Sequence, residues 1–577
     1  MEEEISDSRS CYRMTRHSWF TQRAFTINKQ HNIWDRESGL NRYNKQGCLP
    51  VLTHEQEFYR SIVPGLSVSN AGYGLGFIRK FTPDGKMLIS FSLQKDALWV
   101  FKYKGVGSVQ NSLRSCYEEV VDCDLDIDPD LAQDLFNFHL AIPIITEQYS
   151  RWTLNREFSI FLENGRYVLL AARCYINYIS VPREYYLKYP DIHDDTEIFD
   201  YTFFLVDLKE GIVSDTYKIR DYVSLNNNYG VSAVGNLIAI TSYCRQCIDI
   251  LEVHNGKLVS LCQLNKEQET MRREQLNHEL HTNGVPEPPM KGILSPLKQQ
   301  CISHLYKEAN ACNCCERKER LLKFYKDFPL YEEVKLAKSQ FINKETLLMR
   351  FEMPRNTSTD TGSEQPSRDT MYFKLYVFYS LSELKVLRIF QHDSKELLHL
   401  QRDFYESLRN VRSWHTGRPA SSPSNSIYYR FKHDTCIKHC ANDPATEYNI
   451  KLPLCVDCTS CSPYLNFDVF LYDDRLISPT ETPKYMSNRP ITFMDRLTSA
   501  VNYRIHLDTS QLSNSKRNHL VSFVFHPYEP FFISVQQVFG SIDRSILVNF
   551  HMYCTTTKVS QKKDFKSATN DKRQRLL

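Results

Sequence analysis

Apolar runs alternate with turn residues along most of this chain, and one stretch shows the pattern most clearly. Residues 81–91 read FTPDGKMLISF, a tight turn at Pro83-Asp84-Gly85 followed by an apolar run. Proline presets φ, the aspartate side chain caps the turn, and glycine takes the positive φ that a turn often needs. A second apolar run, ALWVFKY at 97–103, follows a short polar link. The two runs predict a β-hairpin.

The same turn and strand return further along the chain. Residues 161–170 (FLENGRYVLL) keep the phenylalanine, the Asn-Gly turn and the strand, and residues 525–535 (FHPYEPFFISV) keep the phenylalanine and a proline without the glycine. A recurring strand-turn-strand unit predicts a repeat architecture, because one four-stranded unit cannot bury both of its faces alone. We therefore predict an all-β-dominated fold, a WD40-like β-propeller of about seven blades with α-helical insertions.

The strand pattern divides the chain into three parts. Residues 1–56 form a polar N-terminal extension with helical turns near 31–43, residues 57–553 form the propeller, and residues 554–577 form a basic tail that we expect to be disordered.

Two segments inside the predicted propeller change to helical spacing. Leucines and aromatic residues recur at that spacing over 293–328, which predicts a helical insertion, and again over 394–410, which predicts a helix. Strands are expected on both sides, including one over 341–352.

Composition and charge narrow the class of protein. Aromatic residues make up 12% of the 577 residues, which favours β structure. A formal net charge of +3 is too small for a nucleic-acid surface, which needs a concentrated basic face. The acidic start, MEEEIS, lacks the apolar region of a secretory signal, and no apolar run approaches the ~18 residues of a membrane span. We expect a soluble intracellular protein whose 18 cysteines are mostly reduced thiols, buried or metal-bound, rather than a disulfide framework.

Cysteines cluster in a loop over 433–461. Its members are Cys436, Cys440, Cys455, Cys458 and Cys461. Two cysteine pairs separated by a short loop can form a tetrahedral zinc site, but the long gap in the first pair and the irregular segment around the second favour free thiols. We predict no metal and no cofactor. A zinc-containing chromatin or nucleic-acid binding protein is the alternative.

No motif commits the chain to catalysis. The sequence contains no nucleophile elbow, phosphate-binding loop or HExxH pair. Cys244 and Cys247 have the spacing of a redox pair, but a strand rather than a helix follows them. We predict no catalytic residue and no enzymatic activity.

Several blocks of the chain resemble the De-etiolated (light-mediated development) family. The most specific are 462–475 (SPYLNFDVFLYDDR), 521–536 (VSFVFHPYEPFFISVQ) and 548–552 (VNFHM). Agreeing blocks are the hairpin region 75–105, residues 155–161 (NREFSIF), the helix around Leu297 and residues 429–432 (YRFK).

That resemblance implies a non-catalytic subunit of a cullin-RING E3 ubiquitin ligase of the cullin-four type, acting in the nucleus as a substrate receptor and scaffold. The implied partners are the damage-specific DNA-binding adaptor with its small associated factor, the ligase core, a ubiquitin-conjugating enzyme and the photomorphogenesis-repressor RING ligase. The expected result is degradation of transcription regulators. Holding an enzyme near a substrate raises its effective concentration without new chemistry. Nucleic acid is expected to be met only indirectly, through chromatin.

The resemblance extends to one docking segment. Residues 32–37 (NIWDRE) resemble the family's N-terminal helical segment, which implies adaptor binding by Ile33 and Trp34 in a groove and by Arg36 at its rim. Alternatively, the two apolar side chains fold back on the propeller. The basic tail is either a nuclear-import signal or solvated disorder.

Overall fold

A computed structural model describes most of the predicted propeller region. The described residues are 59–109, 131–175, 198–264, 295–353, 373–400, 462–477, 490–505, 519–538 and 546–553, with short gaps inside some of these ranges. The extension 1–56, the docking segment 31–43, the cysteine-rich loop 433–461 and the tail 554–577 lie outside them.

Within these residues the chain is mostly β and forms six antiparallel sheets, numbered here in chain order. Sheet 1 contains β2 (Phe77–Phe81), β3 (Met87–Phe91), β4 (Ala97–Tyr103) and β5 (Phe136–Pro143). Sheet 2 contains β6 (Thr153–Leu154), β7 (Ile160–Leu162), β8 (Tyr167–Tyr175), β9 (Phe199–Asp207) and β10 (Ile212–Asp221). Sheet 3 contains β11 (Val231–Val234), β12 (Leu237–Ser242), β13 (Cys247–His254) and β14 (Lys257–Leu264).

The C-terminal half of the chain supplies the other three sheets. Sheet 4 contains β15 (Lys335–Phe341), β16 (Thr346–Glu352), β17 (Lys374–Ser380) and β18 (Lys385–Gln391). Sheet 5 contains β19 (Phe470–Leu471), β20 (Ile491–Asp495) and β21 (Val501–Ile505). Sheet 6 contains β22 (His519–Phe525), β23 (Phe531–Val538), β24 (Ile546–Met552) and the early strand β1 (Leu66–Val68). The first described strand therefore pairs with the last.

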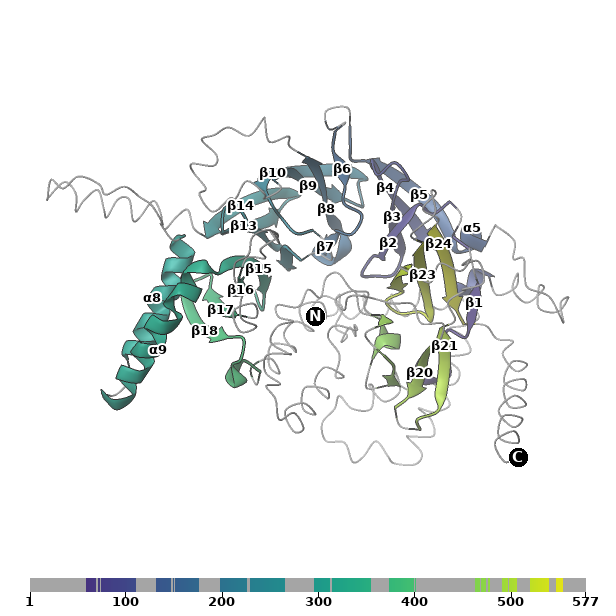
Figure 1. Ribbon diagram of the computed structural model, residues 1–577. Helices are drawn as coiled ribbons and strands as arrows, with labels where there is room; N and C mark the ends of the chain where they lie inside the picture. The colour runs from purple at the N-terminus through teal and green to yellow at the C-terminus, as the bar shows by residue number, and fades with distance from the viewer. Residues whose placement is uncertain are drawn as a thin grey trace, which may run out of the picture.

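Neighbouring sheets pack face to face around an arc (Figure 1). In β3, Leu88 packs toward sheet 6 and its neighbour Ile89 packs toward sheet 2. Further apolar clusters join sheet 2 to sheet 3, sheet 3 to sheet 4, and sheet 5 to sheet 6. Because both faces of such a strand are buried, it is a continuous apolar run rather than an alternating one.

The recurring turn lies where adjacent sheets meet. Gly85 (φ +72°) and Gly165 (φ +90°) both adopt positive φ. A Cβ on Gly85 would lie 2.6 Å from His526 Nε2, and one on Gly165 would lie 2.7 Å from Pro83 Cδ. Each glycine thus serves two purposes, because it turns the chain and leaves room for the turn of the neighbouring sheet.

His526 lies in the third copy of this turn, which contains no glycine. Hydrogen bonds from the histidine side chain hold this turn instead. Its Nδ1 accepts the N–H groups of Tyr528 (3.1 Å) and Glu529 (2.8 Å), so its Nε2 carries the hydrogen and donates to the Gly85 carbonyl (2.9 Å). Glu529 in turn accepts the Tyr103 hydroxyl (3.0 Å). Sheet 6 is therefore tied to sheet 1 by a neutral, buried histidine, and burial lowers the pKa of that histidine.

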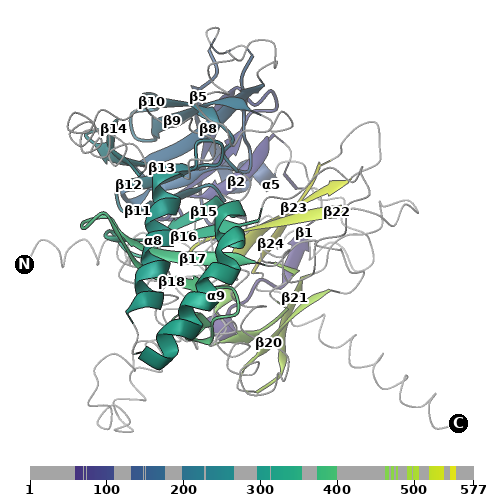
Figure 2. The ribbon, with the colours of Figure 1, turned by 60° about the vertical axis from the view of Figure 1, so that its left-hand side comes forward.

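Two helices form a pair on the outer side of sheet 4 (Figure 2). They are α8 (Pro296–Asn310), capped by the Ser295 side chain, and α9 (Cys314–Glu333). Their buried faces join the core between sheets 3 and 4. The shorter helices are α5 (Leu131–Leu135) and the 3₁₀ turns η3 (Val106–Val109), η5 (Glu163–Gly165) and η9 (Pro463–Leu465). No helix in the described ranges is long and apolar enough to cross a membrane.

The structure sharpens the expectations from sequence. The mostly-β fold is confirmed, β4 has the limits of the predicted run 97–103, and β3 lies in the apolar run predicted after the turn. The predicted closed ring of about seven blades stays a prediction, since the described residues form six sheets in an arc. Helices α8 and α9 lie at 296–310 and 314–333, where an insertion over 293–328 was expected, while most of the predicted helix 394–410 lies outside the described residues.

One predicted strand is wrong. The expected strand 341–352 is the end of β15, a turn, and β16. Asn343 produces the turn, because its side-chain oxygen accepts the N–H groups of Glu345 (2.8 Å) and Thr346 (2.7 Å). This local hydrogen bonding competes with a continuous strand.

Candidate functional site

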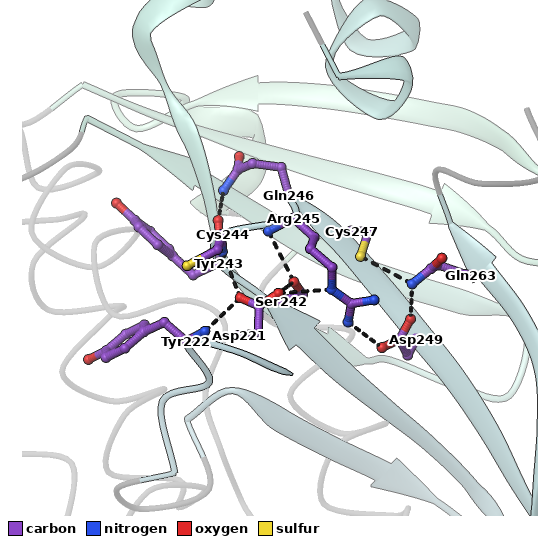
Figure 3. A network of polar contacts seen from close by, with 10 residues as sticks. All are labelled: Asp221, Tyr222, Ser242, Tyr243, Cys244, Arg245, Gln246, Cys247, Asp249 and Gln263. Carbon is purple, nitrogen blue, oxygen red and sulfur yellow. Dashed lines mark hydrogen bonds and ion pairs between the residues drawn. The ribbon is translucent and has the colours of Figure 1, made fainter. Parts of the chain in front are cut away.

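A buried network of polar side chains joins sheets 2, 3 and 4 at one end of their strands (Figure 3). Asp221 ends β10, Ser242 ends β12, and Asp249 lies in β13. The residues between β12 and β13, YCRQ at 243–246, place the polar Arg245 and Gln246 between two apolar runs, a pattern that favours a turn.

Asp221 is the acceptor at the centre of the network and is fully buried. It accepts the backbone N–H groups of Tyr222 (2.6 Å) and Cys244 (2.8 Å), and it also accepts the Ser242 hydroxyl. A buried carboxylate is tolerated when such donors surround it. Asp221 therefore holds the turn after β12 against the end of β10.

Arg245 bridges two buried carboxylates. Its Nε donates to Asp221 Oδ2 (2.9 Å), and a terminal nitrogen donates to Asp249 Oδ2 (2.8 Å). Only 16% of the arginine side chain is exposed. Burial would lower the pKa of Arg245, but the Asp249 and Asp221 carboxylates raise it above its ordinary value. The guanidinium therefore stays charged and links sheet 2 to sheet 3.

Gln246 extends the network to sheet 4. Its side-chain oxygen accepts the Leu336 N–H (2.7 Å), and its nitrogen donates to the carbonyls of Tyr243 (2.6 Å) and Leu336 (3.3 Å). The amide thus pairs with β15 as a strand backbone would. Gln246 has φ +51°, so the turn is strained to aim this side chain at sheet 4.

The two cysteines of the turn are structural. Cys244 and Cys247 are buried, and burial raises the pKa of both thiols, that of Cys247 to about 12. A thiol that stays protonated is a poor nucleophile and a poor redox group. Strand β13 follows the pair, in agreement with the sequence argument against a redox motif.

Two tyrosines lie over the network at the surface. The rings of Tyr222 and Tyr243 meet edge to face with centroids 6.0 Å apart, and the Tyr243 N–H donates to the Tyr222 carbonyl (3.1 Å). Tyr222 is 37% exposed. Figure 3 shows both rings on one side of the network, directed away from the Arg245 guanidinium. Tyr243 is half-buried. A partly exposed aromatic pair on a rigid base is the kind of surface that anchors protein partners. We call it the tyrosine pair.

The arrangement is suited to positioning rather than to reaction. Asp221, Arg245 and Asp249 bond to one another and to backbone groups in the interior, so none is presented to a substrate. Among the described residues, no group of three or more His, Cys, Asp or Glu side chains could hold a metal ion.

The site residues predicted from sequence and the polar network described by the structure lie in different parts of the chain. The predicted adaptor-binding residues Ile33, Trp34 and Arg36 lie outside the described residues, as does the cysteine loop 433–461. The sequence analysis missed the Arg245 network. Its signal was a polar turn between apolar runs, which does not show that the charges are buried.

Comparisons with known proteins agree on one family. A sequence model of the family De-etiolated protein 1 (Det1) matches residues 156–554. The chain is 25% identical over 540 residues to the light-mediated development protein DET1 of Solanum lycopersicum, covering 88% of this chain and 97% of that protein. It is 23% identical over 521 residues to the protein of the same name from Arabidopsis thaliana, and this match covers 84% of this chain and 92% of the Arabidopsis protein.

A solved structure adds nothing to this picture. The match to Pyrococcus horikoshii acylaminoacyl peptidase covers 55% of this chain and 44% of the peptidase chain, with 9% sequence identity and a TM-score of 0.20. A likeness of this size does not inform the fold.

Proposed function

Because the chain belongs to the De-etiolated protein 1 (Det1) family, we propose that it is a non-catalytic subunit of a cullin-RING E3 ubiquitin ligase of the cullin-four type. The observation that carries the proposal is the family match over 156–554, which includes every strand from β7 to β24. The two plant relatives align over nearly their whole length, which extends this support to the rest of the chain.

In this role the chain is a substrate receptor and scaffold. It binds the damage-specific DNA-binding adaptor with its small associated factor, and through them the cullin-four core. It also binds a ubiquitin-conjugating enzyme and the photomorphogenesis-repressor RING ligase. It acts in the nucleus by proximity, since two proteins held on one platform meet at a high effective concentration. The buried and mutually bonded groups around Arg245 support a scaffold rather than an enzyme.

We propose further that the six sheets are blades of a WD40-like β-propeller. Three features support this architecture. Neighbouring sheets pack face to face, the turns at Gly85, Gly165 and His526 meet at one end of their sheets, and β1 completes the sheet formed by the last strands. Pairing of the first strand with the last joins the two ends of a repeat array and leaves fewer free edges.

The tyrosine pair is our candidate for a partner-contact surface on this platform. The Arg245 network holds its backbone from three sheets, so little conformational entropy is lost when a partner binds. Adaptor docking is assigned to Ile33 and Trp34, with Arg36 at the rim, as the family resemblance implies.

Affinity purification tests both assignments. The full-length chain is purified beside the Ile33→Ala/Trp34→Ala and Tyr222→Ala/Tyr243→Ala variants, and partners are identified by mass spectrometry. We expect the cullin adaptor with the wild type and with the tyrosine variant, and not with the Ile33/Trp34 variant. Adaptor in all three samples would leave the function standing and remove the docking segment. Adaptor in none would refute the ligase role, and zinc analysis of the cysteine loop would then test the alternative.

A further inference from the structure

Helix α9 carries an apolar stripe on the side that faces solvent. Leu322 is 65% exposed and Tyr325 is 62% exposed. They stand three residues apart, so they are neighbours on one helix face. Single exposed apolar residues are common, but an adjacent leucine and tyrosine on the same face form a patch. Figure 1 places α9 at the outer edge of the arc.

The stripe is not the packing face of the helix. That role belongs to Phe324 and Tyr331, which are buried in the core between sheets 3 and 4. Leu322 and Tyr325 point away from that packing face, because each step along an α-helix turns the side-chain direction by about 100°. The Tyr325 ring meets the buried Phe324 ring edge to face, with centroids 5.5 Å apart. The apolar surface of the helix therefore continues beyond the part that the core covers.

Cations flank the stripe. Lys318 stands one turn before Leu322, and Lys326 stands one turn after it, so both lie beside the two apolar side chains. Exposed residues of the segment 316–326 include five cations and two carboxylates, namely Arg317, Lys318, Arg320, Lys323 and Lys326 against Glu316 and Glu319. Arg320 pairs with Glu316 at 3.2 Å, which leaves the lysines beside the stripe as the dominant charge.

We propose that this face, defined by Lys318, Leu322, Tyr325 and Lys326, docks an acidic amphipathic helix of a protein partner. The occupant follows from charge complementarity. Leucine-type side chains of the partner would cover Leu322 and Tyr325, and carboxylates on either side of them would meet the two lysines. The surface shares no residue with the segment assigned to the adaptor, so the proposal stands or falls independently of the ligase role.

Two other classes of partner fit less well. A membrane-surface helix has a broad apolar face, whereas here that face is packed against the core and Glu319, Glu332 and Glu333 share the exposed side. Phosphates of nucleic acid would use the lysines and leave Leu322 and Tyr325 uncovered.

The test uses two synthetic helical peptides with the same leucine stripe, one flanked by glutamates and one by lysines. Fluorescence anisotropy measures their binding to the purified full-length chain. We expect the glutamate peptide to bind and the lysine peptide not to bind. Leu322→Ser/Tyr325→Ser should weaken binding by about tenfold or more. Lys318→Glu/Lys326→Glu should abolish it and create binding of the lysine peptide.

A matched control distinguishes binding at this face from non-specific binding to exposed apolar residues. Val259→Ser/Leu261→Ser changes two exposed apolar residues on β14 and should leave peptide binding unchanged. Circular dichroism and thermal denaturation check that each variant is folded. The proposal is overturned if the glutamate peptide fails to bind, if the charge reversal leaves it bound, or if the same variants instead lose binding to a DNA duplex or to phosphatidylserine vesicles.

Discussion

Two buried polar junctions hold neighbouring sheets together in this molecule by different chemistry. Between sheets 6 and 1, a neutral His526 bonds to Gly85 and to backbone groups of its own turn. Among sheets 2, 3 and 4, Arg245 bridges Asp221 and Asp249. The neutral junction fails when it gains a charge, and the ionic junction fails when it loses one. Both junctions hold neighbouring sheets together, but they respond in opposite ways to a change of charge.

The largest effect is expected at the ionic junction. Arg245→Met leaves two buried carboxylates without their shared cation and should lower the free energy of unfolding by about 3–5 kcal/mol. Urea denaturation measures it. The control is Arg220→Met, because Arg220 pairs with Asp200 at the surface and its loss should cost at most about 1 kcal/mol. Equal losses in the two variants would contradict the structural role of Arg245.

The glycine turns come next. Gly165→Ala should lower the free energy of unfolding by about 2–4 kcal/mol, since a positive φ disfavours alanine and the new Cβ would meet Pro83. Gly74→Ala is the matched control, because Gly74 also has a positive φ but has no atom within 4 Å of the added Cβ. It should lose only about 1–2 kcal/mol. The difference in free energy of unfolding between the two variants measures the contact between the turns of sheets 1 and 2. Equal losses would mean that these turns are not in close contact.

The neutral junction should show itself through pH. Burial lowers the pKa of His526 in the folded state below its unfolded value of about 6.5, so the unfolded chain binds the proton more readily. Stability should therefore be intact above that pH and fall as the pH drops below it, by at most about 1.4 kcal/mol per pH unit for this one group.

His526→Gln isolates this contribution from that of the other histidines. A glutamine amide can still donate to the Gly85 carbonyl but does not titrate. Thermal or urea denaturation between pH 7.5 and 5.5, conditions chosen to bracket about 6.5, should show a shallower pH dependence for the variant. Identical slopes would show that His526 does not set the acid sensitivity.

The smallest change in stability is expected at the tyrosine pair. Tyr222→Ala/Tyr243→Ala removes rings at the surface and leaves the backbone bonds to Asp221 in place. The free energy of unfolding should change by about 1 kcal/mol or less, while a co-purifying partner other than the adaptor is lost. A large loss of stability would show that the rings belong to the ionic junction instead of to a binding surface.

Local residue order was enough to predict several elements. The turn at Pro83-Asp84-Gly85 and the apolar runs after it predicted β3 and β4, and β4 has the predicted ends, because turn chemistry and strand burial both act over a few residues. The strand over 341–352 was predicted wrongly. Its apolar residues outweighed Asn343, whose side-chain bonds make a turn that composition alone does not reveal.

By itself, the sequence determined the mostly-β class, the recurring turn, the helical insertion and the family, all of which depend on residue order along short stretches. Only the tertiary structure decided which turns meet, and therefore that Gly85 needs room for His526, which is 441 residues away. The same holds for Arg245, whose charge is buried only because the ends of β10 and β12 converge on it. The physical reason is that burial and pairing of a charge depend on neighbours that are distant in sequence, and a single sequence contains no record of which distant residues meet.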